Sequence, residues 1–232
     1  MARYSSAYSS FISRVDEVSL LQRAAAKLER VDPISNRAQI NALCRGAVVL
    51  LSSHLEAFIK ELGELLLDRL FSKSVDRSKF DSRIFYHVSK EHLDNIKDTA
   101  DHEAIVRAIF RFIGEDSTYW STSGTLPRVI DAERFNRGFA NPKFKKIKAY
   151  FNRFGFERYQ TELARLLTRN FTTDTNMVTH LVDTRNLIAH GDPGATKTPS
   201  EVRDMVQIVV RFCKSTDKVF GDWCKGKYCA IR

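Results

Sequence analysis

Apolar side chains recur at three- and four-residue steps along most of the chain, which is the period of a helix that buries one face. The segment from Ser6 to Leu28 follows this period, and Asp32-Pro33 ends it. A second run, from about Arg37 to Phe71, has no internal proline and a wide apolar stripe. We expect it to form a long core helix. Gly46 and Gly63 either weaken that helix locally or let a neighbouring element approach closely.

The second half of the chain repeats the helical period. Asn141-Pro142 is expected to open a helix that ends at Gly155. The pattern of residues 157–171 predicts a further helix. Asp174 is a candidate N-cap for a helix that runs to His190, where Gly191 fits a left-handed C-terminal cap. A last long helix is expected to begin after Thr198-Pro199-Ser200-Glu201 and to end near Phe220. The stripe of Phe144, Ile147, Phe151 and Phe154 has the spacing of a buried face, which we favour over a base-stacking platform.

The middle of the chain is more polar. Residues 74–116 read as a charged helical stretch, and residues 117–127 as a looser segment rich in Ser, Thr and Gly. No segment alternates as a strand would, and ten Gly and five Pro supply few tight turns for a β-barrel or sandwich. We therefore predict an all-α fold and a single domain, residues 1–232.

Hydropathy and cysteine use point to a cytoplasmic protein. The longest strongly apolar run, Ala47 to Leu51, is far shorter than the ~20 residues that cross a bilayer, and no signal peptide is recognised. The four cysteines are sparse for a disulfide framework, and the spacing of Cys224 and Cys229 is unusual for zinc. We expect free thiols in preference to a structural role.

Net charge is +9 and unevenly distributed. Between Arg134 and Arg169 there are ten basic residues and only two acidic ones, Glu157 and Glu162, so this block carries +8. Such a block suits a polyanion such as RNA, although a solvated helical face is an equal alternative. The candidate contacts to an RNA backbone are Lys143, Lys145, Lys146 and Lys148.

The segment Thr184-Arg185-Asn186-Leu187-Ile188-Ala189-His190-Gly191 resembles the signature of the HEPN superfamily: an Arg, then a polar residue, then a His a few positions on. The long upstream helix through His54, Leu55 and Glu56, and the segment 141–155, resemble the RiboL-PSP-HEPN branch in particular. The resemblance covers residues 40–70 and 141–215 and leaves 74–135 unexplained. It implies a core at about 36–72 and 141–220, with an insertion at about 74–135.

This resemblance implies a helical bundle that dimerises and sets two motifs face to face across a cleft. It also implies a metal-independent endoribonuclease without a cofactor, of the kind found in toxin–antitoxin or antiviral defence systems. Two alternatives stay open: a catalytically silent module that binds RNA or a partner protein, and a regulatory subunit whose output belongs to another chain.

The motif residues suit cleavage of RNA by its own 2′-OH. Histidine, with an ordinary pKa of about 6.5, can transfer protons near neutral pH, which is the role expected of His190. Arg185 offers a permanent charge for phosphate oxygens, and Asn186 can orient either group. Arg185 and His190 are five positions apart, so their side chains point roughly 140° apart on a helix. A dimer could bring an Arg and a His together. The competing interpretation makes His190 a helix cap and Arg185 half of a structural ion pair.

The other candidate side chains are weaker. His54 and Glu56 are expected to pack or pair, with a supporting role at the site as the alternative. His87, His92 and His102 are interpreted as surface residues, and His180 as a surface residue that could border the cleft. No cluster of Asp, Glu, His or Cys has convincing metal-ligand spacing, so no metal site is predicted.

Overall fold

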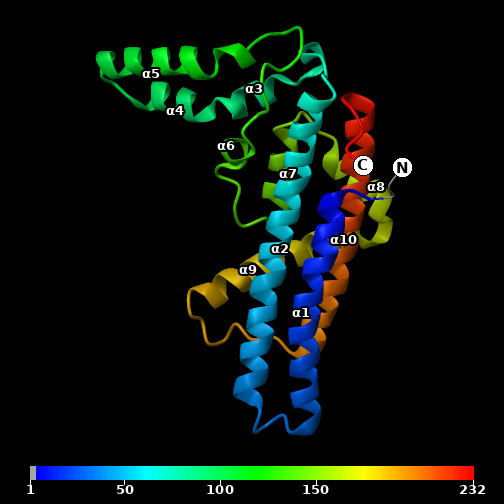
Figure 1. Ribbon diagram of the computed structural model, residues 1–232. Helices are drawn as coiled ribbons and strands as arrows, with labels where there is room; N and C mark the ends of the chain where they lie inside the picture. Colours follow the sequence, from blue (N-terminus) through cyan, green and yellow to red (C-terminus); the bar gives the residue numbers. More distant parts are fainter. Residues whose placement is uncertain (1–3) are drawn as a thin grey trace.

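The computed structural model describes residues 4–232, which form ten α-helices and three short 3₁₀-helices without a strand. Helices α1 (Ser6–Val31) and α2 (Arg37–Ser72) form a long antiparallel pair, and α10 (Pro199–Lys227) lies beside both (Figure 1). The remaining helices are α3 (Ser82–Val88), α4 (Lys90–Asp98), α5 (His102–Glu115), α6 (Ala132–Asn136), α7 (Phe144–Asn152), α8 (Tyr159–Leu167) and α9 (Phe171–Ala189). The predicted all-α fold is confirmed.

Local hydrogen bonds mark the start of α1 and the turn between α1 and α2. Ser5 caps α1 by accepting a hydrogen bond from the Tyr8 N–H. At the far end, the Asp32 carboxylate accepts from the N–H groups of Ile34 and Ser35, which holds the tight turn into α2. The predicted pair of helices is therefore confirmed, with α1 one turn longer than expected.

Helix α2 is the centre of the core, and Gly63 is the reason a neighbour can pack directly on it. A Cβ atom at position 63 would lie 2.0 Å from the Tyr150 hydroxyl and 2.9 Å from its ring. Tyr150 is fully buried there and donates a hydrogen bond to Asn136 Oδ1 at 2.5 Å. The close approach expected of this glycine is confirmed, and it sets α7 against α2.

Helix α2 also contains a segment that is long and apolar enough to span a membrane, judged by length and composition only. The short apolar run from Ala47 to Leu51 did not predict such a segment. Half of this segment is buried inside the protein. The core helix of a globular protein meets the same description.

Helix α10 starts as predicted and ends later. Thr198 and Glu201 form a reciprocal capping box with Pro199 in the first turn. The helix continues two turns past Phe220 because Phe220 and Cys224 are fully buried against the core, so packing overrides the weak helix propensity of Gly221.

Two local predictions in the second half are wrong. Asp174 does not cap α9, which begins three residues earlier; it is fully buried and receives two hydrogen bonds from Arg211 of α10. The helix expected over residues 157–171 is interrupted, because Thr168 adopts a left-handed backbone (φ +50°) that ends α8.

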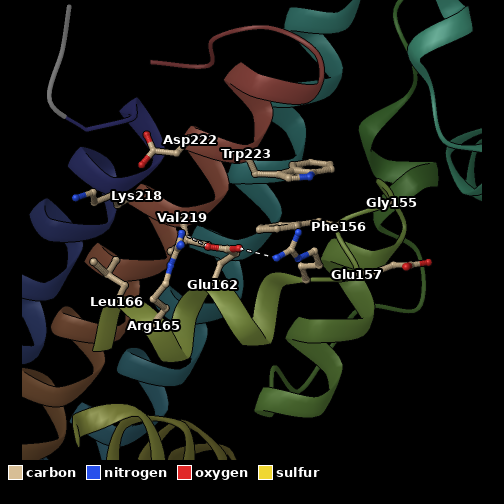
Figure 2. Close-up of a pocket in the computed structure, with 11 residues that line it drawn as sticks. Gly155, Phe156, Glu157, Glu162, Arg165, Leu166, Lys218, Val219, Asp222 and Trp223 are labelled. Atoms are coloured by element: carbon tan, nitrogen blue, oxygen red, sulfur yellow. Dashed lines mark hydrogen bonds and ion pairs between the residues drawn. The ribbon is translucent and has the colours of Figure 1, made fainter. Parts of the chain in front are cut away.

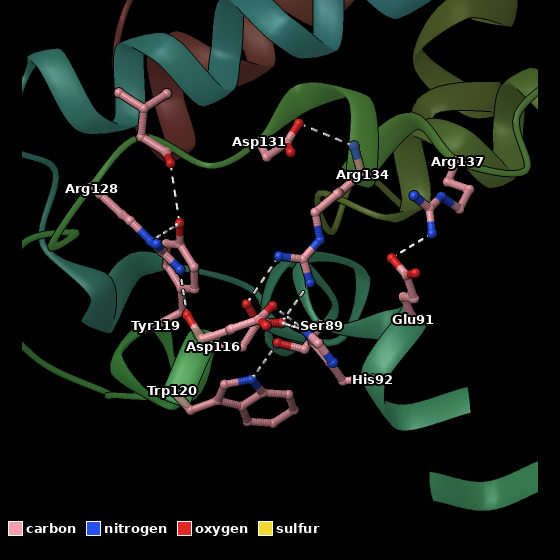
Figure 3. A network of polar contacts seen from close by, with 12 residues as sticks. Ser89, Glu91, His92, Asp116, Tyr119, Trp120, Arg128, Asp131, Arg134 and Arg137 are labelled. Atoms are coloured by element: carbon pink, nitrogen blue, oxygen red, sulfur yellow. Dashed lines mark hydrogen bonds and ion pairs between the residues drawn. The ribbon is translucent and has the colours of Figure 1, made fainter. Parts of the chain in front are cut away.

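The predicted helical stretch 74–116 is confirmed as helical but divided into α3, α4 and α5. Helices α4 and α5 form a hairpin that projects from one end of the long pair (Figure 1). A polar network joins the base of this hairpin to the residues that follow it (Figure 3). At its centre the fully buried Asp116 accepts two hydrogen bonds from Arg134, at 3.2 and 2.9 Å.

The same region corrects the interpretation of two histidines as surface residues. His92 is buried, with Nε2 3.1 Å from Glu115 Oε2 and 3.6 Å from Asp116 Oδ2. His87 is half-buried against Phe135, and burial together with the nearby Arg153 lowers its pKa to about 4. Only His102 of the three is exposed. A helical period could not reveal this burial, because the covering side chains come from residues 115–153.

Candidate active site

The carboxyl end of α9 presents the predicted motif on a tight turn. His190 is the C-cap residue, and Gly191 follows with φ +79°, the left-handed conformation expected of it. Gly191 N–H donates to Ile188 O at 3.1 Å and Asp192 N–H to Leu187 O at 3.0 Å, the bonding pattern of a Schellman motif. The His190 side chain is exposed and forms no hydrogen bond or ion pair with residues 4–232.

Arg45 of α2 holds this turn from outside the motif. Its guanidinium donates to the carbonyl oxygens of Ile188 (3.4 Å), Asp192 (2.8 Å) and Ala195 (3.5 Å). These are backbone acceptors at and after the helix end, where intrahelical partners run out. Arg45 therefore fixes the position of His190 relative to the core helix. No local pattern indicated this role of Arg45, since the contacts join residues about 145 positions apart.

Arg185 is half-buried and held by neutral groups. Its Nη1 donates to Asn141 Oδ1 at 3.3 Å and to Asn186 Oδ1 at 3.1 Å. No carboxylate pairs with it among the described residues, so the structural ion pair considered as an alternative is not present there. Both hydrogen bonds use Nη1, so Nη2 and Nε of Arg185 have no partner among residues 4–232. An arginine held this way keeps its charge for an incoming anion.

Asn141 connects this arginine to α2. Its backbone is left-handed (φ +55°), a conformation that Asn tolerates better than most residues. Its N–H donates to Glu56 Oε2 at 3.1 Å, while Glu56 Oε1 accepts from Lys60 at 2.8 Å. Glu56 thus both pairs within its helix and supports the loop behind Arg185. His54 instead packs toward α1, 3.6 Å from Glu17, and burial lowers its pKa.

Arg185 and His190 have different surroundings within the described chain. Arg185 points into the loop that precedes α7, whereas His190 projects from the end of α9, and no hydrogen bond connects them among residues 4–232. Leu187 lies between them in the sequence and is 49% exposed. His180, further up the same helix, is exposed.

The four candidate lysines divide into two groups. Lys143 forms an ion pair with Asp183, two residues before Arg185, so it lies beside the motif. The other three, Lys145, Lys146 and Lys148, are exposed. Lys146 donates to Ala140 O at 3.0 Å, and Lys148 donates to Gln160 Oε1 at 3.1 Å. Several arginines of the basic block are paired with acids elsewhere, Arg134 with Asp116 and Arg137 with Glu91 among them. The block is therefore less uniformly positive than its sequence indicated.

No group of three or more His, Cys, Asp or Glu side chains placed to hold a metal ion occurs within residues 4–232. All four cysteines lie in the described chain as free thiols, as predicted.

Comparison with protein families supports the resemblance seen in the motif. The family model described as RiboL-PSP-HEPN matches residues 9–222. This match includes most of α1 and the whole region from α3 to α6. Both lie outside residues 40–70 and 141–215, which carried the resemblance in the sequence. No curated protein and no solved structure gives a significant match.

Proposed function

The chain belongs to the RiboL-PSP-HEPN family, and on that premise we propose that it is a metal-independent endoribonuclease that works as a homodimer. The observation that carries the proposal is the state of the two motif side chains. Arg185 is oriented by amides alone, and His190 stands exposed and unpaired on a rigid turn among the described residues. His190 does occupy the C-cap position that the competing interpretation gave it, but this role uses only its backbone and leaves the imidazole free.

In the proposed reaction, the imidazole of one His190 takes the proton of a ribose 2′-OH as its oxygen attacks the adjacent phosphorus. The free Nη2 and Nε of Arg185 stabilise the charge on the non-bridging oxygens. The bond to the 5′ oxygen then breaks, and that oxygen receives a proton from an imidazolium. The products are a 2′,3′-cyclic phosphate and a 5′-hydroxyl. Asn186 orients Arg185 and has its amide N–H groups available for phosphate.

The five-residue step between Arg185 and His190, which points their side chains roughly 140° apart on a helix, supports the homodimer. A two-fold axis beside the end of α9 would let the histidine of one protomer face the arginine of its partner. The exposed Leu187 supplies an apolar contact next to that axis. We further propose that Lys143, Lys145, Lys146 and Lys148 contact the RNA backbone and that the biological role is that of a toxin or an antiviral defence component.

The test is incubation of the purified protein with total RNA in excess EDTA. We expect cleavage by the wild-type protein and its loss in His190→Ala and Arg185→Ala, with unchanged melting temperatures. His180→Ala is the matched control, because it removes an exposed histidine from the same helix. Binding of RNA without cleavage would instead favour the silent module, and full activity in His190→Ala would refute the assignment.

A further inference from the structure

Two hollows share Glu157 in their walls and differ in charge. The larger, of about 670 Å³, lies between α8 and α10 (Figure 2). It is lined by three acids and three bases, and Glu162 pairs there with Arg158 and Arg165. The other, of about 520 Å³, lies between α7 and α8 and has two lysines against Glu157. We call it the α7–α8 groove. Charge balances in the larger hollow and is positive in the groove.

Helix α7 presents two of its lysines to the groove and turns the third away. Lys145, Lys148 and Asn152 line the groove and are three and four residues apart, which places them on one side of the helix. Lys146 lies about 100° around the helix from Lys145 and about 160° from Lys148. It is outside the groove and donates to Ala140 O. Lys145 and Lys148 therefore share a surface that the neighbouring lysine does not reach.

The side chains of the groove mainly offer hydrogen-bond donors. Gln160 Oε1 accepts from Lys148 at 3.1 Å, and Asn152 Oδ1 accepts from Arg83 at 2.6 Å. A cation thus engages the oxygen of each amide, and the amide N–H groups have no partner among residues 4–232. Lys148 uses one of its three N–H donors in this way, and Lys145 forms no ion pair within the same range. These donors fit a ligand that only accepts hydrogen bonds.

The charge of the groove adds a preference for an anion. Its acid, Glu157, is held by Arg83 at 2.7 Å, whereas Lys145 and Lys148 are exposed. An oxyanion in the groove would meet two ammonium groups and the N–H groups of neutral amides. Ammonium groups and amides of this kind are common partners of phosphate oxygens in nucleic acids.

Helix α7 also connects the groove to the motif. Asn141, four residues before Lys145, accepts a hydrogen bond from Arg185 at 3.3 Å. Lys143 pairs with Asp183, two residues before Arg185. Four residues of chain span at most about 14 Å, so the Cα atoms of Asn141 and Lys145 are no further apart than that. One strand of RNA is therefore long enough to reach both Arg185 and the groove.

We propose that the α7–α8 groove binds a phosphate of the RNA strand that the motif cleaves, a few nucleotides from the cleaved bond. The inference rests on the proposed function, because the strand is taken to be the substrate. Lys145 and Lys148 neutralise one phosphate, and the amide of Gln160 donates to its oxygens. The groove holds the strand by its backbone, so it adds affinity without a preference for sequence.

The experiment measures binding without cleavage. A fluorescein-labelled single strand of 2′-O-methyl RNA, which lacks the attacking hydroxyl, is titrated with the intact protein while its anisotropy is followed. In a series of such strands, one linkage at a time is replaced by a neutral methylphosphonate. We expect one or two of these replacements to weaken binding roughly tenfold, as the loss of charge-assisted hydrogen bonds does.

The decisive comparison is with Lys145→Gln/Lys148→Gln. This variant should bind the unmodified strand roughly tenfold more weakly, with a salt dependence reduced by about 0.7 in slope for the lost phosphate contact. Neutralising the same one or two linkages should then cause no further loss, since both changes remove one interaction. The charge-matched control is Lys143→Gln/Lys146→Gln, which removes two lysines of the same block outside the groove. It should keep the full loss at those linkages.

The amide is tested in the same assay. Gln160→Ala should weaken binding about fivefold in the wild-type background and have little effect in Lys145→Gln/Lys148→Gln. Gln207→Ala, which removes an exposed glutamine of α10 outside the groove, should leave binding unchanged.

The outcomes separate the groove from the catalytic proposal. Linkage-specific loss that disappears in Lys145→Gln/Lys148→Gln supports the groove, even if the wild-type protein cuts no RNA and is only a binding module. Cleavage by the wild-type protein, together with the same linkage-specific loss in Lys145→Gln/Lys148→Gln as in the wild type, would overturn the groove and keep the nuclease. Equal loss at every linkage would also overturn the groove, because it shows a diffuse charge effect.

Discussion

At the scale of single residues, Asn141 decides whether the charge of Arg185 is available. It presents an amide oxygen to the guanidinium from a left-handed backbone position. The local pattern predicted that Asn141-Pro142 opens a helix, and α7 begins two residues after Pro142, at Phe144. The contact of Asn141 with a residue 44 positions later depends on how α7 and α9 pack. The motif residues themselves could be found from the sequence because their spacing is local. Their supporting residues, Asn141 and Arg45, could not.

We therefore expect Asn141→Asp to lower RNA cleavage more than Asn141→Gly. Glycine keeps the left-handed backbone and removes one hydrogen bond that the charged guanidinium donates to a neutral amide oxygen, a loss of about 1.5 kcal/mol, or roughly tenfold in rate. Aspartate would pair with Arg185 and compete with phosphate. The measurement is the initial cleavage rate of each variant at equal RNA concentration. Equal rates for Asn141→Asp and the wild type would show that Arg185 does not act through its charge.

His87 gives a prediction for stability against pH. Its pKa is lowered to about 4 in the folded protein, so between pH 6.5 and 4 the unfolded chain binds more protons than the folded one. Stability should fall as pH decreases through this range. After allowance for solvent near this half-buried side chain, we expect His87 to account for about 1–2 kcal/mol of the loss. Urea unfolding at pH 7 and pH 4.5 measures it.

The comparison uses two variants, His87→Gln and the exposed control His102→Gln. The loss between the two pH values should be smaller in His87→Gln than in the wild type and unchanged in His102→Gln. An identical pH dependence in all three proteins would show that folding does not lower the pKa of His87.

At the scale of elements, long helices could be predicted from period and caps, whereas interruptions could not. α2 and α10 begin where their patterns indicate, because caps and apolar stripes are local. Thr168 ends α8 through its left-handed backbone. Asp174 lies inside α9, where its pairing with Arg211 of α10 is a tertiary contact that no local pattern indicates. The division of residues 74–116 coincides with N-caps at Asp81 and Asp101, which the apolar period alone did not separate.

The link between α2 and α9 through Arg45 leads to a prediction at this scale. Arg45→Ala leaves the Asp192 carbonyl without its 2.8 Å donor, and the turn that carries His190 should become mobile. We expect faster amide exchange at residues 190–195 and slower cleavage, with exchange elsewhere unchanged. Hydrogen exchange read out by mass spectrometry, together with a cleavage assay, measures both. Slower cleavage without any change of exchange at 190–195 would assign Arg45 a different role.

At the scale of the whole molecule, the prediction concerns how two chains share one site. If each site takes Arg185 from one protomer and His190 from its partner, neither Arg185→Ala nor His190→Ala is active alone. Mixing the two variants forms heterodimers in which one of the two sites is intact. Random pairing should then restore about a quarter of the wild-type rate. Continued inactivity of a mixture shown to contain heterodimers would place both residues of each site on one chain.

The central claim is that the RNA cleaves itself, with Arg185 and His190 assisting, and the chemistry of the product ends tests it most directly. A defined oligoribonucleotide is cut by the protein in excess EDTA, and the ends are identified by mass spectrometry. A matched substrate carries 2′-deoxyribose at the scissile position. We predict 2′,3′-cyclic phosphate and 5′-hydroxyl ends from the first substrate and no cleavage at that position in the second. Products with 5′-phosphates, or cleavage at the deoxyribose position, would contradict the account.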